Sequence, residues 1–325
     1  LMSEFENIIY EKSEGIAYIT LNRPKALNAV NTRMRDELYE VLPALKDDPE
    51  VRVAIIKGSG DRAFSAGADI GKFPTMLGDK NASMQYARDC AKVQRFMDQM
   101  GKPVIAALNG LAMGGGLEVA IRCHGIVSVE KAVLQFPEIT LGILPGIGGC
   151  VVPYRKWPQG TALFHEMILF GKPVPVTTAA EMGIINNLVK DPADLITAAV
   201  KEVQQIQDNI PRISDASVDI PEISIPDKPV AGKQPLSKEA VGIAADTVRR
   251  ASAADDLETA LEIGYEGFGD IACSAAAKEG ISAFLEKRKP VFKYIHCASL
   301  SDATSSLFGN KINNHIVHVL VRGNN

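Results

Sequence analysis

The sequence has few cysteines and no long run of one charge. Its 325 residues include five cysteines, which are widely spaced and form no C-x-x-C pair. This pattern predicts neither a disulfide framework nor a zinc site and favours a reducing compartment. The longest basic run is Lys287–Lys289, and the formal net charge is −4 with a pI near 5.8. Nucleic acids and anionic membrane surfaces are therefore not expected partners.

Long apolar runs and a targeting signal are also missing. The most apolar segment, 103–121, is interrupted by Asn109, Glu118 and four glycines, so it is a poor transmembrane candidate. The first seven residues carry two acids and no basic region followed by an apolar stretch. We expect a cytoplasmic protein. The strongest motifs of P-loop, zincin and α/β-hydrolase chemistry are absent as well.

What is present is a globular composition, with 46% hydrophobic and 23% charged residues. β-rich runs at 16–21, 53–56 and 104–108 predict strands. They alternate with amphipathic runs at 33–46, where we expect Thr32 to be the cap, and at 82–100. This alternation predicts the α/β class.

The later chain divides by composition. Residues 1–209 read as the core, and its part from 161 onward is mostly helical. Residues 210–236 hold five prolines and predict a linker or an extended surface strap. Residues 237–294 predict helices at 237–251, 257–268 and 275–288, the first capped by Ser237. Residues 295–325 read like a different polypeptide, so we assign no metal site to its His296, His315 and His318.

The densest chemical signal is the segment 102–120. It reads as a strand that runs into Gly114–Gly116 and then into a short helix bearing Glu118. Free N–H groups at a helix N-terminus stabilise negative charge, and donors aimed at an oxyanion contribute about 3–4 kcal/mol each in a transition state. The alternative is that the glycines only allow close packing and that Glu118 is a solvated acid favoured by the helix dipole.

A second carboxylate, Glu138, lies among apolar neighbours in the segment 135–142. A buried carboxyl has a raised pKa and can act as a general acid, and two glutamates in different surroundings can become a base and an acid. A structural salt bridge is the alternative for Glu138.

The loop 61–70 offers a further backbone N–H. Its start, 58–63, spells G-x-G-x-x-A, but no convincing helix follows, so NAD binding is disfavoured.

Several motifs together resemble the enoyl-CoA hydratase/isomerase (crotonase) family. They are N-R-P-K-A-L-N at 22–28, F-S-A-G-A-D at 64–69, N-G-L-A-M-G-G-G-L-E at 109–118, and P-E at 137–138 with P-G-I-G-G at 145–149. The resemblance covers about 5–209 and resumes at 284–289. It implies a spiral of ββα units with a C-terminal helical region that forms trimers, often paired as a dimer of trimers.

The resemblance also implies a chemistry. Family members bind an acyl-CoA and stabilise a thioester enolate, here with the N–H groups of Ala66 and Gly115. Hydratases carry both glutamates, so Glu118 is expected to activate water and Glu138 to protonate the α-carbon. The implied reaction adds water to a 2-enoyl-CoA, as in β-oxidation, without metal or cofactor. Other β-oxidation enzymes are further candidate partners.

The resemblance places the substrate and CoA along several segments. The expected contacts are Lys25, Ala26, Ala66, Gly67, Ala68, Asp69, Ile70, Gly114, Pro137, Phe284 and Lys287. Lys287 has the alternative of being a solvated charge at a helix end.

Two segments depart from the family pattern. The connection 210–236 is longer than usual, which resembles crotonase-like domains fused to, or derived from, multifunctional β-oxidation proteins. The segment 150–155 differs from a typical hydratase, which keeps other reactions open. The alternatives are an isomerase, or a hydratase or hydrolase of a cyclic dienoyl- or oxo-enoyl-CoA from aromatic degradation. A non-catalytic acyl-CoA-binding subunit is the alternative of another class.

Overall fold

The computed structural model describes residues 5–206 and 208–292, and two main sheets organise them. The larger sheet has the order β1-β2-β3-β5-β7-β10, with β1 antiparallel to β2 and the other neighbours parallel. Its strands are β1 (Ile8–Ser13), β2 (Ile16–Leu21), β3 (Val53–Gly58), β5 (Val104–Leu108), β7 (Gly125–Val129) and β10 (Asn187–Val189). The smaller sheet, in the order β4-β6-β8-β9, contains β4 (Ala63–Ser65), β6 (Leu111–Met113), β8 (Val133–Gln135) and β9 (Val174–Pro175).

The chain alternates between the two sheets. β3 and β4, β5 and β6, and β7 and β8 each place their first strand in the larger sheet and their second in the smaller one. Helices α2 (Lys80–Asp98) and α3 (Gly114–Arg122) follow the first two pairs. This is the predicted spiral of ββα units. Every residue of β5 is buried, as expected for a parallel strand that is covered on both faces.

The predicted strands at 16–21 and 104–108 have the observed bounds, whereas one predicted cap is wrong. Helix α1 (Thr32–Asp47) begins at Thr32, and its cap is Asn31, whose side chain accepts the Met34 N–H at 2.8 Å. The remaining helices of the core are α4 (Val152–Lys156), α5 (Thr161–Phe170), α6 (Val176–Glu181) and α7 (Leu195–Ile206). Short 3-10 helices are η1 (Pro24–Ala26), η2 (Ile70–Thr75), η3 (Glu138–Leu141), η4 (Pro158–Gly160) and η5 (Pro192–Asp194).

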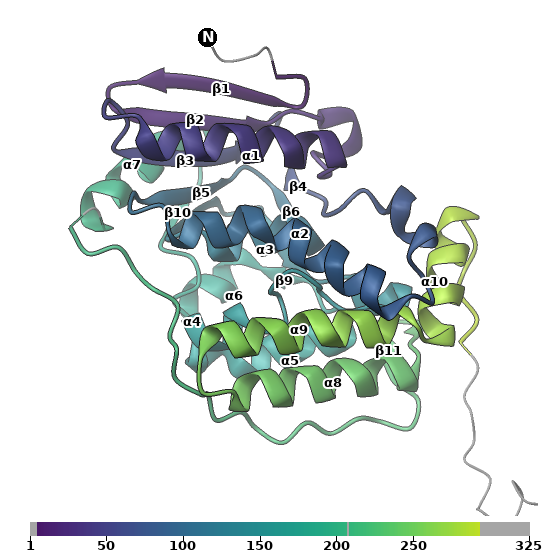
Figure 1. The fold of residues 1–325 in the computed structure, drawn as a ribbon. Helices are drawn as coiled ribbons and strands as arrows, with labels where there is room; N and C mark the ends of the chain where they lie inside the picture. Colours follow the sequence, from purple (N-terminus) through teal and green to yellow (C-terminus); the bar gives the residue numbers. More distant parts are fainter. Residues whose placement is uncertain (1–4, 207, 293–325) are drawn as a thin grey trace, which may run out of the picture. The chain divides into compact units, whose positions relative to one another are not determined.

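Three C-terminal helices complete the described chain: α8 (Lys238–Ala253), α9 (Leu257–Ala272) and α10 (Ala275–Leu285). Ser237 caps α8 as predicted, accepting the Ala240 N–H at 3.2 Å. In Figure 1, α8 and α9 lie side by side, and α9 packs against α2 of the core. Ion pairs between Arg88 and Glu262 (2.7 Å) and between Lys80 and Asp270 (2.6 Å) join α2 to α9. The predicted tail 295–325, with its histidines, lies outside the described residues.

The proline-rich segment 210–236 runs as an extended strap that ends in the short hairpin of β11 (Val230–Ala231) and β12 (Gln234–Pro235). One buried side chain, Arg155 of α4, holds the strap to the helices. Its Nη1 donates to the carbonyls of Ser214, Asp215 and Ala216, and its Nη2 donates to those of Ala251 and Ala254. No helix within the described ranges has the length and apolar character needed to cross a membrane.

We predict that Arg155→Met lowers the free energy of unfolding by about 2–4 kcal/mol, because it removes a buried guanidinium that donates to five carbonyls, including the buried carbonyl of Ala254. Urea denaturation measures this change. Arg249→Met is the matched control, since Arg249 is exposed and pairs with Asp246 within one helix; we expect a change within about 0.5 kcal/mol. Equal effects of the two substitutions would contradict the role of Arg155.

Candidate active site

Glu118 is a buried carboxyl held by the backbone of a glycine-rich turn. It lies on α3, its side chain is 3% exposed, and its Oε1 accepts the N–H groups of Ile147 (2.9 Å) and Gly149 (2.7 Å). The turn comes close to Oε1 because Gly149 has no side chain: a Cβ there would lie 3.1 Å from Oε1 and 2.5 Å from the Cβ of Pro145. The alternative of a solvated acid is therefore wrong.

Glu138, the first residue of η3, has a different environment. Its Oε2 is buried and has no hydrogen-bond partner among the described residues, which also provide no ion pair for it. The carboxyl lies against Gly114, where a Cβ would approach Oε1 to 2.7 Å. Gly114 also has a φ of +48°, so a side chain there would be doubly disfavoured. The salt-bridge alternative for Glu138 is not supported.

Both carboxyls have raised pKa values, for partly different reasons. Burial raises the pKa of Glu118 to about 7, opposed by the N–H groups of Gly149 and Ile147 and by the charge of Arg122. Burial raises the pKa of Glu138 well above its usual value, and the charge of Glu118 raises it further. Near neutral pH, Glu118 is therefore the carboxyl that ionises and Glu138 the one that keeps its proton.

The structure corrects one of the predicted oxyanion donors. The Ala66 N–H donates to the carbonyl of Leu27 at 2.9 Å, so it is not free for a ligand. Two residues later, the N–H of Ala68 has no backbone partner among the described residues. Gly115, in the first turn of α3, lies next to it: a Cβ on Gly115 would be 3.4 Å from the Ala68 nitrogen. The pair of neighbouring donors is thus Ala68 and Gly115.

A cavity of about 450 Å³ joins these groups. The predicted residues that line it are Glu118, Glu138, Ala66, Gly67, Ala68, Ile70, Gly114, Gly115, Pro137 and Phe284. Asp69 is outside it and lines an adjoining pocket instead. Lys25 and Ala26 lie exposed on η1, and Lys287 is also exposed; none of the three lines the cavity.

Apart from Phe284, the part of the cavity wall that the C-terminal region supplies was not predicted from the sequence. This part comprises Gln234, Phe268, Gly280, Arg288, Lys289 and Pro290. Gln234 belongs to the proline-rich segment, and its side-chain amide donates at 3.0 Å to the carbonyl of Thr140, two residues after Glu138. The basic residues at 287–289 were the available signal, but sequence alone could not show which of them faces the cavity.

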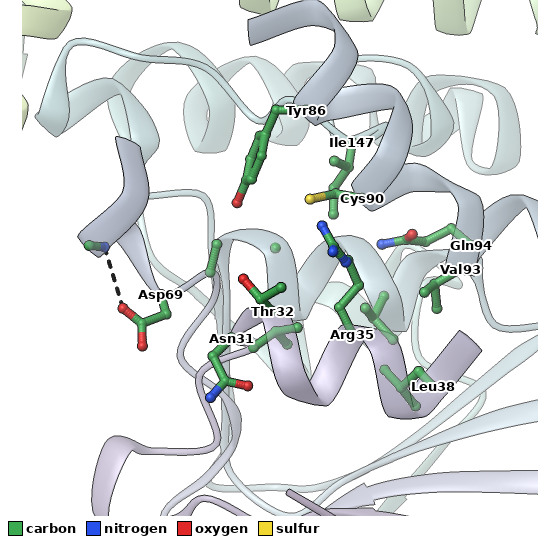
Figure 2. Close-up of a pocket in the computed structure, with 15 residues that line it drawn as sticks. Asn31, Thr32, Arg35, Leu38, Asp69, Tyr86, Cys90, Val93, Gln94 and Ile147 are labelled. Carbon is green, nitrogen blue, oxygen red and sulfur yellow. Dashed lines mark hydrogen bonds between the residues drawn. The ribbon is translucent and has the colours of Figure 1, made fainter. Parts of the chain in front are cut away.

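A smaller pocket of about 190 Å³ adjoins the cavity and shares Ala68, Tyr86, Cys90, Gly115 and Ile147 with it. Residues of α1 and α2 form its walls (Figure 2). Figure 2 shows the guanidinium of Arg35 directed toward the sulfur of Cys90. Helical spacing places both Tyr86 and Cys90 on one face of α2, a signal that was available in the sequence. In the described ranges, no group of three or more His, Cys, Asp or Glu residues could hold a metal ion.

Comparison with known sequences shows the family of the chain. The sequence model of the enoyl-CoA hydratase/isomerase family matches residues 11–221, and the chain belongs to this family. Crotonyl-CoA hydratase of Syntrophomonas wolfei is 34% identical over 294 residues, which are 89% of this chain and 98% of that protein. Short-chain-enoyl-CoA hydratase of Clostridium acetobutylicum is 33% identical, with 88% and 97% covered.

Solved structures agree with the fold. An enoyl-CoA hydratase from Bacillus anthracis is 27% identical, covers 89% of this chain and 99% of its own, and has a TM-score of 0.57. An enoyl-CoA hydratase/isomerase from Xanthobacter autotrophicus is 26% identical, with 87% and 94% covered and a TM-score of 0.64.

We predict that Glu118→Gln lowers the pKa of Glu138, because it removes the neighbouring charge, but leaves it above the usual value because burial remains. A ¹³C NMR titration of labelled glutamate carboxyls measures this shift. Glu202→Gln is the control, since Glu202 is a buried glutamate of α7 that does not line the cavity. An unchanged Glu138 titration in Glu118→Gln would show that the two carboxyls are not coupled.

Proposed function

We propose that the protein is an enoyl-CoA hydratase, which adds water across the 2,3 double bond of a 2-enoyl-CoA to give the 3-hydroxyacyl-CoA. One observation carries the proposal: two buried carboxyls with different environments face one cavity beside the N–H groups of Ala68 and Gly115. The names of relatives that cover most of this chain support the same activity.

In this proposal the thioester oxygen lies between the N–H groups of Ala68 and Gly115, which stabilise the enolate that forms when C3 is attacked. Ionised Glu118 takes a proton from the attacking water, so the hydroxyl bonds to C3. Protonated Glu138 gives its proton to C2. Dehydration reverses these steps. Hydration involves no net redox change, and the two carboxyls carry both protons, so the proposal needs neither a metal nor a cofactor.

The CoA contacts follow from the cavity and its surroundings. We assign the acyl and pantetheine contacts to residues 66–70, Gly114 and Pro137, and the mouth of the cavity to Phe284. Lys25, Ala26 and Lys287, which are exposed and do not line the cavity, are candidates for contacting the CoA nucleotide outside it. Arg288, which lines the cavity, is a better placed cation than Lys287.

We further propose a homotrimer or dimer of trimers in the cytoplasm, acting in β-oxidation and without nucleic-acid or membrane partners. Exposed apolar side chains at the end of α10 and beyond, Phe284, Leu285 and Val291, support burial against another copy of the chain. Light scattering after size-exclusion chromatography tests the assembly.

We predict that Glu118→Gln and Glu138→Gln each lower kcat for crotonyl-CoA hydration by about 10²–10⁴-fold, because each removes a positioned proton-transfer group. Loss of the enoyl-thioester ultraviolet absorbance measures the rate. Glu202→Gln, which also alters a buried glutamate, should retain activity. Unchanged rates in both active-site variants would refute the mechanism, whereas binding of acyl-CoA without any exchange of its α-protons would indicate a non-catalytic subunit.

The raised pKa values of Glu118 and Glu138 predict how the reaction rate depends on pH. Activity should fall below about pH 7, where Glu118 becomes protonated and cannot accept a proton from water. It should fall again at higher pH, where Glu138 loses the proton that it must donate. The dependence of kcat/KM on pH in the parent protein measures both limits. An acid limit near pH 4.5 would contradict the assignment of Glu118 as a desolvated base.

A second candidate reaction uses the same chemistry on a bulkier, ring-derived acyl group. The smaller pocket beside Gly115 and Ile147 offers space for such a group. A relative from Thauera aromatica that is 29% identical is named (E)-benzylidenesuccinyl-CoA hydratase. Turnover of a cyclic dienoyl-CoA without turnover of crotonyl-CoA would favour this candidate over the short-chain hydratase.

A further inference from the structure

A buried cation lies one helical turn beyond Glu118. Arg122 occupies the last turn of α3, four residues after Glu118, and is 2% exposed. Residues four apart lie on the same face of a helix. Burying an unpaired guanidinium costs free energy, so the groups that contact Arg122 indicate what its positive charge stabilises.

Asp98, the last residue of α2, binds one edge of the guanidinium. Nε of Arg122 donates to Oδ1 at 3.2 Å, and Nη2 donates to Oδ2. Asp98 is 24% exposed and retains access to solvent. This ion pair directs the opposite edge of the guanidinium, which bears Nη1, away from Asp98.

Nη1 lies against the turn that binds Glu118. It is buried without a hydrogen-bond partner among the described residues, and a Cβ added to Gly148 would lie 3.2 Å from it. Gly148 has a φ of +126°, a conformation that side chains rarely adopt. It separates Ile147 from Gly149, the two residues whose N–H groups bind Glu118. The cation therefore contacts the support of the carboxylate rather than the carboxylate itself.

We propose that Arg122, fixed by Asp98, is a positioning residue that holds the 146–149 turn in place and stabilises the negative charge of Glu118. The expected effect of Arg122 on the reaction rate rests on the proposed function. Its expected effect on the ionisation of Glu118 does not depend on turnover. The charge of Arg122 opposes the effect of burial on Glu118. Without Arg122, the cation is lost and Asp98 is left unneutralised, and both changes disfavour an ionised Glu118.

Other titratable groups surround this centre and stay the same in each variant below. They are Cys90 and Asp98 from α2, Glu138 from η3, Cys150 after the turn, Lys156 from α4 and Tyr265 from α9. A difference between variants at position 122 therefore reports the charge at that position together with its neutralisation of Asp98.

The test compares Arg122→Met, which removes the charge but keeps an unbranched side chain, with Arg122→Lys, which keeps the charge. In Arg122→Met we expect the titration of the Glu118 carboxyl, followed by ¹³C NMR and assigned with Glu118→Gln, to move up by about one pH unit. The acid limit of kcat should move with it, with kcat lowered about tenfold and KM changed less than about twofold. In Arg122→Lys, which keeps the positive charge, the Glu118 carboxyl should titrate close to the pH at which it titrates in the parent protein.

Arg155→Met is the matched control, because it removes a buried arginine that does not contact the 146–149 turn. It should lower stability without moving the Glu118 titration. An unmoved Glu118 titration in folded Arg122→Met, or an equal shift in Arg122→Lys, would overturn the inference. Failure of the parent protein to hydrate crotonyl-CoA would instead refute the proposed function, and the NMR comparison would still decide the role of Arg122.

Discussion

The two hydrogen bonds from the N–H groups of Ile147 and Gly149 to Glu118 are the constraint on which the site depends. They join residues 29 and 31 positions apart and fix the glycine-rich turn against α3. A carboxylate without such donors would be too costly to bury at this depth. Because the donors are backbone groups in a turn that allows close approach, the charge can be held inside the protein while one carboxylate oxygen remains available to the cavity.

The second carboxyl differs because it lacks these donors. Glu138 is placed at the start of η3 against Gly114, and its buried Oε2 has no partner among the described residues. Similar chemical groups thus acquire opposite roles from their surroundings: hydrogen-bonded Glu118 favours the ionised form, and unpartnered Glu138 favours the protonated one. The two residues are of the same type. They differ in whether backbone N–H groups of a turn donate hydrogen bonds to the carboxyl.

Sequence patterns predicted the strands and helices that depend on residues close together in the chain. The apolar run 104–108 became a buried parallel strand, and the glycines at 114–116 began a helix that carries Glu118 inward. Contacts between distant segments could not be predicted in this way. The loop at 64–69 contains several N–H groups, and only the folded chain shows that the Ala66 N–H donates to the carbonyl of Leu27, whereas the Ala68 N–H has no backbone partner among the described residues. Arg122 was not identified from the sequence, because Asp98 and Gly148 are distant from it along the chain and lie close to it only in the folded protein.

The segment that follows the family match completes the wall of the cavity. Both glutamates, Ala68 and Gly115 lie within the 11–221 match to the family, whereas Gln234, Phe268 and Arg288 follow it. The proline-rich strap is therefore more than a connection, because its end places Gln234 against the carbonyl of Thr140, in the helix that begins with Glu138. Selection among acyl groups is therefore physically possible at the walls contributed by 234–290 as well as at those that the core contributes.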